Sequence, residues 1–189
     1  MKYLKKINKE FVEDFLEVEL KPNIISIGWD VSMRSTGIAV IRTTDSYLTV
    51  EILDKIQIPK SVNDKDALDL FIDQVDSFAK KISQTYKIDY NVIEDCFFGN
   101  NVKTLKALAR HSALVYDRFR GLSRIQYFIL PTTARSRVNF KKSSKEIKGQ
   151  ALKKEIIDYI NNALSLTLTA KDTDLSDALV LALAGLTEE

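Results

Sequence analysis

The chain has 189 residues, a length that fits one domain with at most a short appendage. Its 28 basic and 26 acidic side chains leave a net charge of +2, which by itself indicates neither a nucleic-acid partner nor a membrane partner. A single cysteine (Cys96) excludes an intrachain disulfide, and one cysteine with one histidine (His111) is too few for a zinc site built from protein ligands. Any catalytic metal would therefore be held by oxygen.

The opening residues predict an amphipathic helix, because apolar side chains recur every three or four positions from Leu4 to Val18. Residues 21–23 (KPN) would end it. The first twenty residues carry five acidic side chains and no long apolar stretch, so no secretory signal is visible. We expect a soluble, intracellular protein, of cytoplasmic location, that does not enter a membrane.

The rest of the chain alternates between strand and helix patterns. Strands are predicted over residues 24–30, 36–42, 48–58, 90–94 and 125–130, and helices over 63–86, 102–120, 145–164 and 174–186. Strands at hairpin spacing followed by alternating units predict an α/β fold, a five-stranded mixed sheet with helices on both faces. The N-terminal helix is an addition to it. No linker is long enough to separate two domains.

Positive charge is concentrated in one stretch. Residues 118–154 contain eleven basic side chains and one acid, Glu146, a local net charge of +10. A solvated helix face usually mixes both signs, so we favour a phosphate-binding surface over a plain solvent-exposed one.

Four acids occupy positions where carboxylates are uncommon. Asp30 and Glu94 each end an apolar strand, while Asp174 and Asp177 share one face of the first turn of an apolar helix. Taken singly, each has a structural explanation as a helix cap, a dipole partner or a loop-edge acid. The carboxyl ends of parallel strands lie side by side, so Asp30 and Glu94 would be neighbours if their strands pair.

Such neighbours repel. Two carboxylates about 5 Å apart repel by roughly 3 kcal/mol at an effective dielectric constant near 20. The cluster would either bind protons more tightly or be neutralised by cations. Oxygen ligands suit Mg²⁺ and Mn²⁺, and two such ions assist phosphoryl displacement. With the basic block, the acids suggest a metal-dependent nuclease.

Three motifs resemble those of RuvC-type Holliday-junction resolvases. Residues 27–32 (IGWDVS) with 35–37 (STG) look like the first motif of that family, and 93–97 (IEDCF) followed by Asn101 look like the second. Leu105, Ala109 and Arg110 continue the similarity down the next helix. Residues 174–179 (DLSDAL) are similar to the closing Asp-x-x-Asp-Ala-Leu. The resemblance spans residues 24–185, and the three motifs are specific when they occur in this order.

The resemblance implies an RNase H-like fold, a homodimer, and paired symmetric Mg²⁺-dependent nicks across a four-way DNA junction. It implies two ions per active site, replaceable by Mn²⁺, held by the catalytic residues Asp30, Glu94, Asp174 and Asp177. Phe97 would stack into the opened junction, although a core position beside Phe98 is an equal alternative. The other residues expected to bind DNA are Asn101, Arg135, Arg137, Lys141, Lys142, Lys145 and Lys148.

The chain departs from the family pattern in two places. Residues 31–32 (VS) stand where bacterial members usually have Pro-Gly, and residues 1–22 have no counterpart in the minimal pattern. We therefore expect an N-terminal helical extension over residues 1–22 and a nuclease domain over 23–189. The divergence favours a phage-encoded or otherwise atypical member.

Other functions remain open on the sequence alone. A nuclease of the same fold could act on flaps, RNA–DNA hybrids or other branched DNA, and a non-catalytic nucleic-acid-binding module could share the scaffold. An actin-like phosphotransferase is disfavoured, because 189 residues supply about half of such an enzyme and no second Gly-rich phosphate loop is present. Junction resolution is the working hypothesis.

Overall fold

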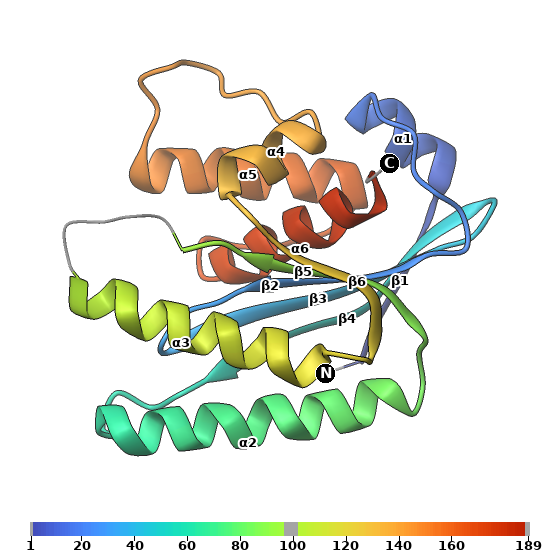
Figure 1. Cartoon of the computed structure of the whole chain (residues 1–189). Coiled ribbons are helices and arrows are strands. Elements are labelled where there is room, and N and C mark those ends of the chain that lie inside the picture. Colours follow the sequence, from blue (N-terminus) through green and yellow to red (C-terminus); the bar gives the residue numbers. More distant parts are fainter. Residues whose placement is uncertain (1, 97–101, 188–189) are drawn as a thin grey trace.

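The computed structural model describes residues 2–96 and 102–187 (Figure 1). Within them the chain forms a six-stranded sheet in the order β1-β4-β3-β2-β5-β6. The strands are β1 (Lys2–Asn8), β2 (Ile25–Asp30), β3 (Ser35–Thr43), β4 (Tyr47–Gln57), β5 (Ile88–Glu94) and β6 (Ser123–Ile129). The helices are α1 (Lys9–Leu16), α2 (Asp64–Ser83), α3 (Val102–Phe119), α4 (Pro131–Arg137), α5 (Gly149–Leu164) and α6 (Thr173–Leu186).

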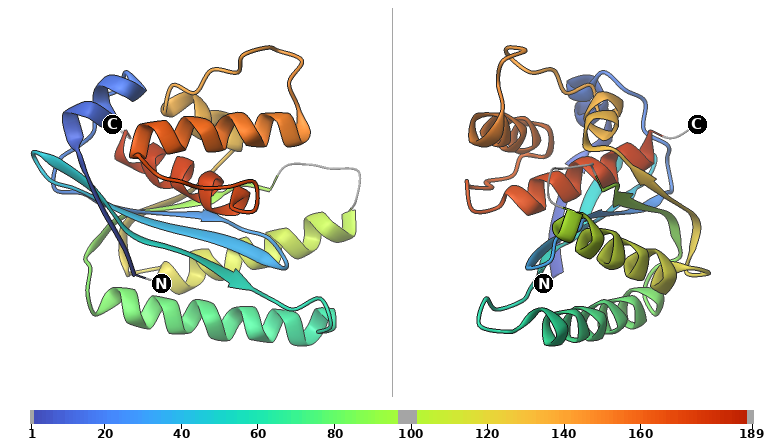
Figure 2. Two further views of the ribbon diagram at one scale, coloured as in Figure 1. Left: turned by 180° about the vertical axis from the view of Figure 1, so that it is seen from behind. Right: turned by 60° about the vertical axis from the view of Figure 1, so that its left-hand side comes forward.

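The mixed sheet expected from the sequence is confirmed. Strands β2, β3 and β4 form an antiparallel meander, while β5 runs parallel to β2 and β6 runs parallel to β5. Helices α2 and α3 cover one face, and α1, α4, α5 and α6 lie on the other (Figures 1 and 2). Among the described residues, no helix combines the length and apolar character needed to cross a bilayer.

The N-terminal segment differs from its prediction. Residues 2–8 form a sixth strand, β1, antiparallel to β4, and the predicted helix begins only at Lys9. Asn8 caps α1, because its side chain accepts a hydrogen bond from the amide of Phe11. The edge of the long strand β4 offers unpaired backbone groups, and pairing with them outweighs the local helical spacing. The sheet therefore has six strands rather than five.

Two further differences lie around the basic block. Residues 131–137 form the short helix α4, where the sequence had indicated only the end of a strand at Pro131. Proline is favoured in the first turn of a helix because it lacks the amide hydrogen that would be unpaired there. The predicted helix over 145–164 begins at Gly149, so residues 138–148 form a loop between α4 and α5.

The side chains of β2 alternate between two apolar cores. Ile27 and Trp29 face α2 and α3, where Trp29 packs edge-on against Phe78 and Phe119. Gly28 faces α6 instead, which is almost entirely buried against the sheet. Since side chains alternate along a strand, Asp30 lies on the α6 side, at the end of the strand.

Candidate active site

The parallel pairing of β2 with β5 brings the first two predicted acids together. Trp29 pairs with Ile93, so the next residues, Asp30 and Glu94, lie side by side at the carboxyl edge of the sheet. Their carboxyl groups are hydrogen-bonded to each other. The predicted neighbourhood of these two acids is thus confirmed by the strand pairing.

Helix α6 brings the other two acids, Asp174 and Asp177, to these strand ends because it lies very close to the sheet. A β-carbon built on Gly37 would fall 2.0 Å from the backbone oxygen of Asp174, and one on Gly28 would fall 2.1 Å from that of Ala178. Both distances are far below any real contact, so only glycine permits this approach. The two glycines on β2 and β3 therefore decide where the first turn of α6, with Asp174 and Asp177, meets the strand ends.

The cluster has an excess of negative charge in a partly buried place. Burial, and then the charges of Glu94, Asp177 and Asp174, raise the pKa of Asp30 well above its ordinary value. Burial also raises the pKa of Glu94 and of Asp177, although hydrogen bonding to Asp30 and the Arg135 charge, respectively, oppose that rise. Carboxylates that raise each other's pKa form a site that favours added positive charge.

Two of the acids are held by neighbouring side chains. Arg135 Nη2 lies 3.3 Å from Asp177 Oδ1. The Asp174 carboxylate accepts a hydrogen bond from the Ser35 hydroxyl, and Lys55 Nζ lies 3.9 Å from it. These contacts fix the two carboxylates from strands β3 and β4 and from helix α4.

The donor set suits a hard divalent cation. All four candidate ligands are carboxylates, which Mg²⁺ and Mn²⁺ prefer, and the pKa of Asp30, of Glu94 and of Asp177 is raised. Within residues 2–96 and 102–187, however, no three acidic, histidine or cysteine side chains converge as a ready-made metal-binding group. Arg135 and Lys55 partly neutralise the site in this arrangement.

The basic residues expected to bind DNA fall into two groups. Arg135 and Arg137 lie on α4, where Arg135 pairs with Asp177 and Arg137 donates to the Tyr127 hydroxyl at 3.1 Å. The lysines are exposed and lie on the loop 138–148: Lys141, Lys142, Lys145 and Lys148. Phe97 and Asn101 lie outside the described residues.

Three side chains of the site were not predicted as functional residues: Ser35, Lys55 and Lys153, whose charge lowers the pKa of Glu94 and of Asp177. Lys55 pairs across the β3–β4 hairpin with Gly37, the residue beneath Asp174. The hairpin register was the signal that could have identified it, but the register depends on a bulge between Val40 and Ile41. Sequence spacing alone does not reveal that bulge.

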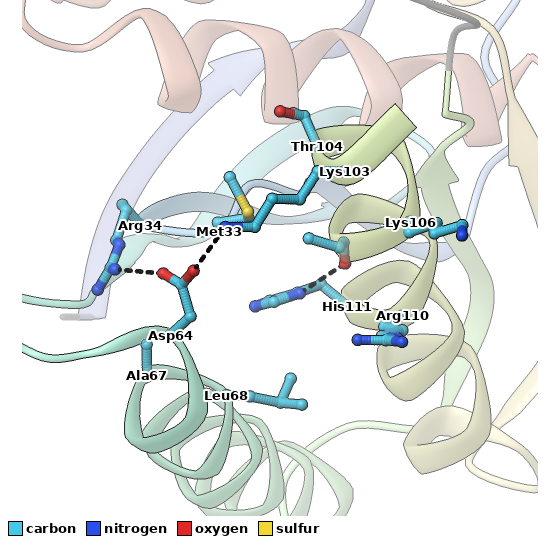
Figure 3. Close-up of a pocket in the computed structure, with 11 residues that line it drawn as sticks. Met33, Arg34, Asp64, Ala67, Leu68, Lys103, Thr104, Lys106, Arg110 and His111 are labelled. Carbon is cyan, nitrogen blue, oxygen red and sulfur yellow. Dashed lines mark hydrogen bonds and ion pairs between the residues drawn. The ribbon is translucent and has the colours of Figure 1, made fainter. Parts of the chain in front are cut away.

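A separate pocket lies between α2 and α3, with a volume of about 470 Å³ (Figure 3). Its wall begins at Met33 and Arg34, three and four residues after Asp30. Arg34 and Lys103 both contact Asp64, at 3.0 and 3.7 Å. The ring of His111 points into the pocket (Figure 3), and the residue is 6% exposed.

Known proteins resemble the chain in sequence and in fold. The family model described as crossover junction endodeoxyribonuclease RuvC matches residues 26–185. The RuvC proteins of Helicobacter pylori strains Shi470 and 26695 are each 27% identical over 157 residues, covering 83% of this chain and 92% of the relative.

Two solved structures share the fold. Thermus thermophilus RuvC in complex with Holliday junction substrate has a TM-score of 0.65 at 13% identity, covering 85% of this chain and 92% of that chain. The yeast mitochondrial Holliday junction resolvase Ydc2 has a TM-score of 0.50 at 12% identity, covering 94% of this chain and 83% of that chain. Since the family model spans most of the chain and the sheet matches, the chain belongs to the RuvC family of crossover junction endodeoxyribonucleases, the Holliday junction resolvases with an RNase H-like fold.

Proposed function

We propose that the chain resolves four-way DNA junctions by paired symmetric nicks, with Asp30, Glu94, Asp174 and Asp177 as its catalytic residues. The observation that carries this proposal is geometric: strand pairing sets Asp30 beside Glu94, and the close approach of α6 to the sheet brings the helix turn with Asp174 and Asp177 to the same strand ends. Acids from two strand ends and one helix have no reason to meet in a partly buried place for stability alone, because their repulsion destabilises the fold.

The same four carboxylates would hold two Mg²⁺ ions, for which Mn²⁺ would substitute. When bound, the ions would neutralise charge on the phosphate and supply Lewis-acid activation for hydrolysis. Burial raises the pKa of Asp30 and of Glu94, so both groups bind protons more tightly than free carboxylates do and would have to be deprotonated to act as ligands. Arg135, which balances the charge of Asp177, lies where it can contact the phosphate that is cut.

The basic surface would bind the phosphates of the junction arms. Arg135 on α4 contacts the Asp177 carboxylate, Arg137 lies on the same helix, and the exposed lysines extend along the loop 138–148. Counter-ion release from these contacts would make junction affinity fall steeply with salt, with a log–log slope near −0.9 for each phosphate contacted.

An exposed apolar face supports a homodimer. Phe128 on β6 is 41% exposed and stacks on Tyr116 of α3 with ring centroids 5.2 Å apart. Val102 at the start of α3 is 54% exposed, and the small residues Ala109 and Ala113 are exposed between them. A second copy that covers this face would give the assembly two active sites, as two symmetric nicks require.

Cleavage of a labelled synthetic four-way junction tests the proposal. Linear duplex, flap and RNA–DNA hybrid controls are incubated with the protein in parallel, with Mg²⁺, with Mn²⁺ and with EDTA. The wild type should produce paired symmetric nicks in the junction only, and EDTA should abolish them. Metal-dependent cutting of flaps or hybrids instead would contradict the assignment of the substrate while retaining the carboxylate chemistry.

A matched pair of variants distinguishes the loss of an active-site carboxylate from the loss of any surface negative charge. Asp30→Asn should abolish cutting, whereas Asp69→Asn, which removes an exposed carboxylate on α2, should cut like the wild type. Equal cutting by both variants would contradict the proposed site. The oligomeric state is tested separately by light scattering, where Phe128→Glu should convert a dimer to a monomer and Arg124→Glu, beside it on β6, should not.

A further inference from the structure

The first 25 residues lie outside the part of the chain that matches the RuvC family model. They form β1, which lengthens the sheet beside β4, and α1, which packs against α5 and buries Val12 and Leu16. Helix α1 of this N-terminal extension lies near α4 and the start of the loop 138–148 (Figures 1 and 2). Its place in the structure points to a role in that loop.

One carboxylate at the end of α1 binds the start of the loop. Glu17 Oε2 accepts a hydrogen bond of 2.7 Å from Asn139 Nδ2 and lies 3.7 Å from Lys141 Nζ. Glu17 and Asn139 both have left-handed backbone conformations, with φ of 53° and 56°. Glu17 follows the end of α1, and Asn139 follows the end of α4. One acid of the extension thus contacts two of the first residues of the loop.

Aromatic packing stabilises the same contact between the end of α1 and the start of the loop. The ring of Tyr159 on α5 packs against the rings of Phe15 and Phe140, with centroid distances of 5.2 Å in both pairs. Its hydroxyl donates to the backbone oxygen of Val138 at 2.6 Å. Burial raises the pKa of Tyr159 to about 12, so the hydroxyl keeps its proton as a donor. The extension, α5 and the loop therefore form one packed unit.

We propose that the N-terminal extension is a brace that holds the basic loop 138–148 in position for DNA, with Phe15 and Glu17 as positioning residues. The inference rests on the proposed function, since it takes the exposed lysines of this loop to contact junction phosphates. A loop that is already ordered loses less conformational entropy when DNA binds. The brace therefore increases affinity without touching the DNA.

The charge of Glu17 gives the proposal a test with a definite sign. Removal of a negative charge close to a DNA-binding surface should by electrostatics alone raise affinity for DNA. The brace predicts the opposite for Glu17→Ala, because Asn139 and Lys141 lose their shared partner. Glu10→Ala and Glu19→Ala remove the same charge from exposed positions on or beside α1 and serve as matched controls.

Junction affinity is measured by fluorescence anisotropy over a series of salt concentrations, in an Asp30→Asn background that binds without cutting. We expect the Phe15→Ala/Glu17→Ala double variant to raise Kd about tenfold, equivalent to about 1.4 kcal/mol, and to make the salt slope shallower. Glu17→Gln retains an acceptor oxygen for Asn139 and should therefore bind the junction nearly as tightly as the parent. The two control variants should bind as tightly as the parent or slightly more tightly.

Hydrogen exchange shows whether the loop responds. The amides of residues 139–147 should exchange faster in the double variant, while those of β2 and β5 stay protected. Unchanged or tighter junction binding by the double variant would overturn the brace, as would equal exchange in the loop. A parent protein that fails to bind junctions at all would instead overturn the proposed function, so the two failures are distinguishable.

Discussion

The acid cluster and the pocket between α2 and α3 lie at the same edge of the sheet but on opposite faces. The acids converge under α6, where glycines at positions 28 and 37 allow backbone-to-backbone contact. On the other face, large side chains such as Trp29 hold α2 and α3 away from the sheet, and the pocket of about 470 Å³ lies between those helices. The size of alternating side chains on one strand thus decides which face can concentrate charge.

The largest expected difference between the two faces is in catalysis. Asp30→Asn should reduce junction cleavage by about 10³-fold, because loss of one charged ligand removes roughly 4 kcal/mol of charge stabilisation in the transition state. Arg110→Ala, in the pocket, should leave the rate of chemistry within a few fold. Single-turnover cleavage of a labelled junction measures both rates. Similar losses in the two variants would mean that the faces are not functionally distinct.

Backbone contact under α6 should make its face the less tolerant of added volume. Gly37→Ala places a methyl group 2.0 Å from the Asp174 backbone oxygen, so α6 must move, and we expect a loss of about 3 kcal/mol in unfolding free energy. Ile38→Val, one residue along on the opposite face, should cost only about 1 kcal/mol. Urea unfolding gives both values. A Gly37→Ala protein as stable as the wild type would contradict the close approach of α6.

The clustered acids should destabilise the protein when no cation is present. In EDTA at neutral pH, Asp30→Asn removes one of the repelling charges and should raise the unfolding free energy by roughly 1–2 kcal/mol. Excess Mg²⁺ should stabilise the wild type and leave the variant nearly unchanged. Thermal melts with and without Mg²⁺ check this reversal. A variant less stable than the wild type in EDTA would show that the cluster is held together by more than cations.

The smallest effect is expected in the pocket, from its one histidine. Burial lowers the pKa of His111, and within the described residues its Nε2 has no hydrogen-bond partner. The folded state thus disfavours the protonated ring, so stability is fully present above the unfolded pKa of about 6.5 and declines as the pH falls below it. The unfolding free energy should therefore fall as the pH is lowered from 7 to 5.

His111→Phe should flatten that dependence, since a phenyl ring can keep the packing on Phe71, whose ring centroid lies 4.6 Å from that of His111. The chain has one histidine, so a single imidazole signal in an NMR titration reports the pKa directly. A midpoint above 6.5 would contradict the sign.

Prediction from the sequence succeeded where one strand or helix carries its own signal. Asp30 and Glu94 stood at the ends of apolar strands, and parallel pairing alone was enough to make them neighbours. It failed at the N-terminus, where the helical spacing of Ile7 with its neighbours was overridden by pairing with Leu48 on the edge of β4. Long-range backbone pairing is invisible to a periodicity that extends over a few residues.

By itself the sequence determined the α/β class and the concentration of positive charge in residues 118–154, and it pointed to the four carboxylates as candidates, because each depends on residue type and local spacing. Only the tertiary structure decided that Ser35 and Lys55 hold Asp174, and that Glu17 contacts Asn139. These contacts join residues far apart in the chain, and they exist because α6 lies directly on glycines and α1 packs against α5. Side-chain size at the interfaces between helices and strands sets those distances. Which side chains meet at an interface depends on the packing of the whole fold, which local spacing does not reveal.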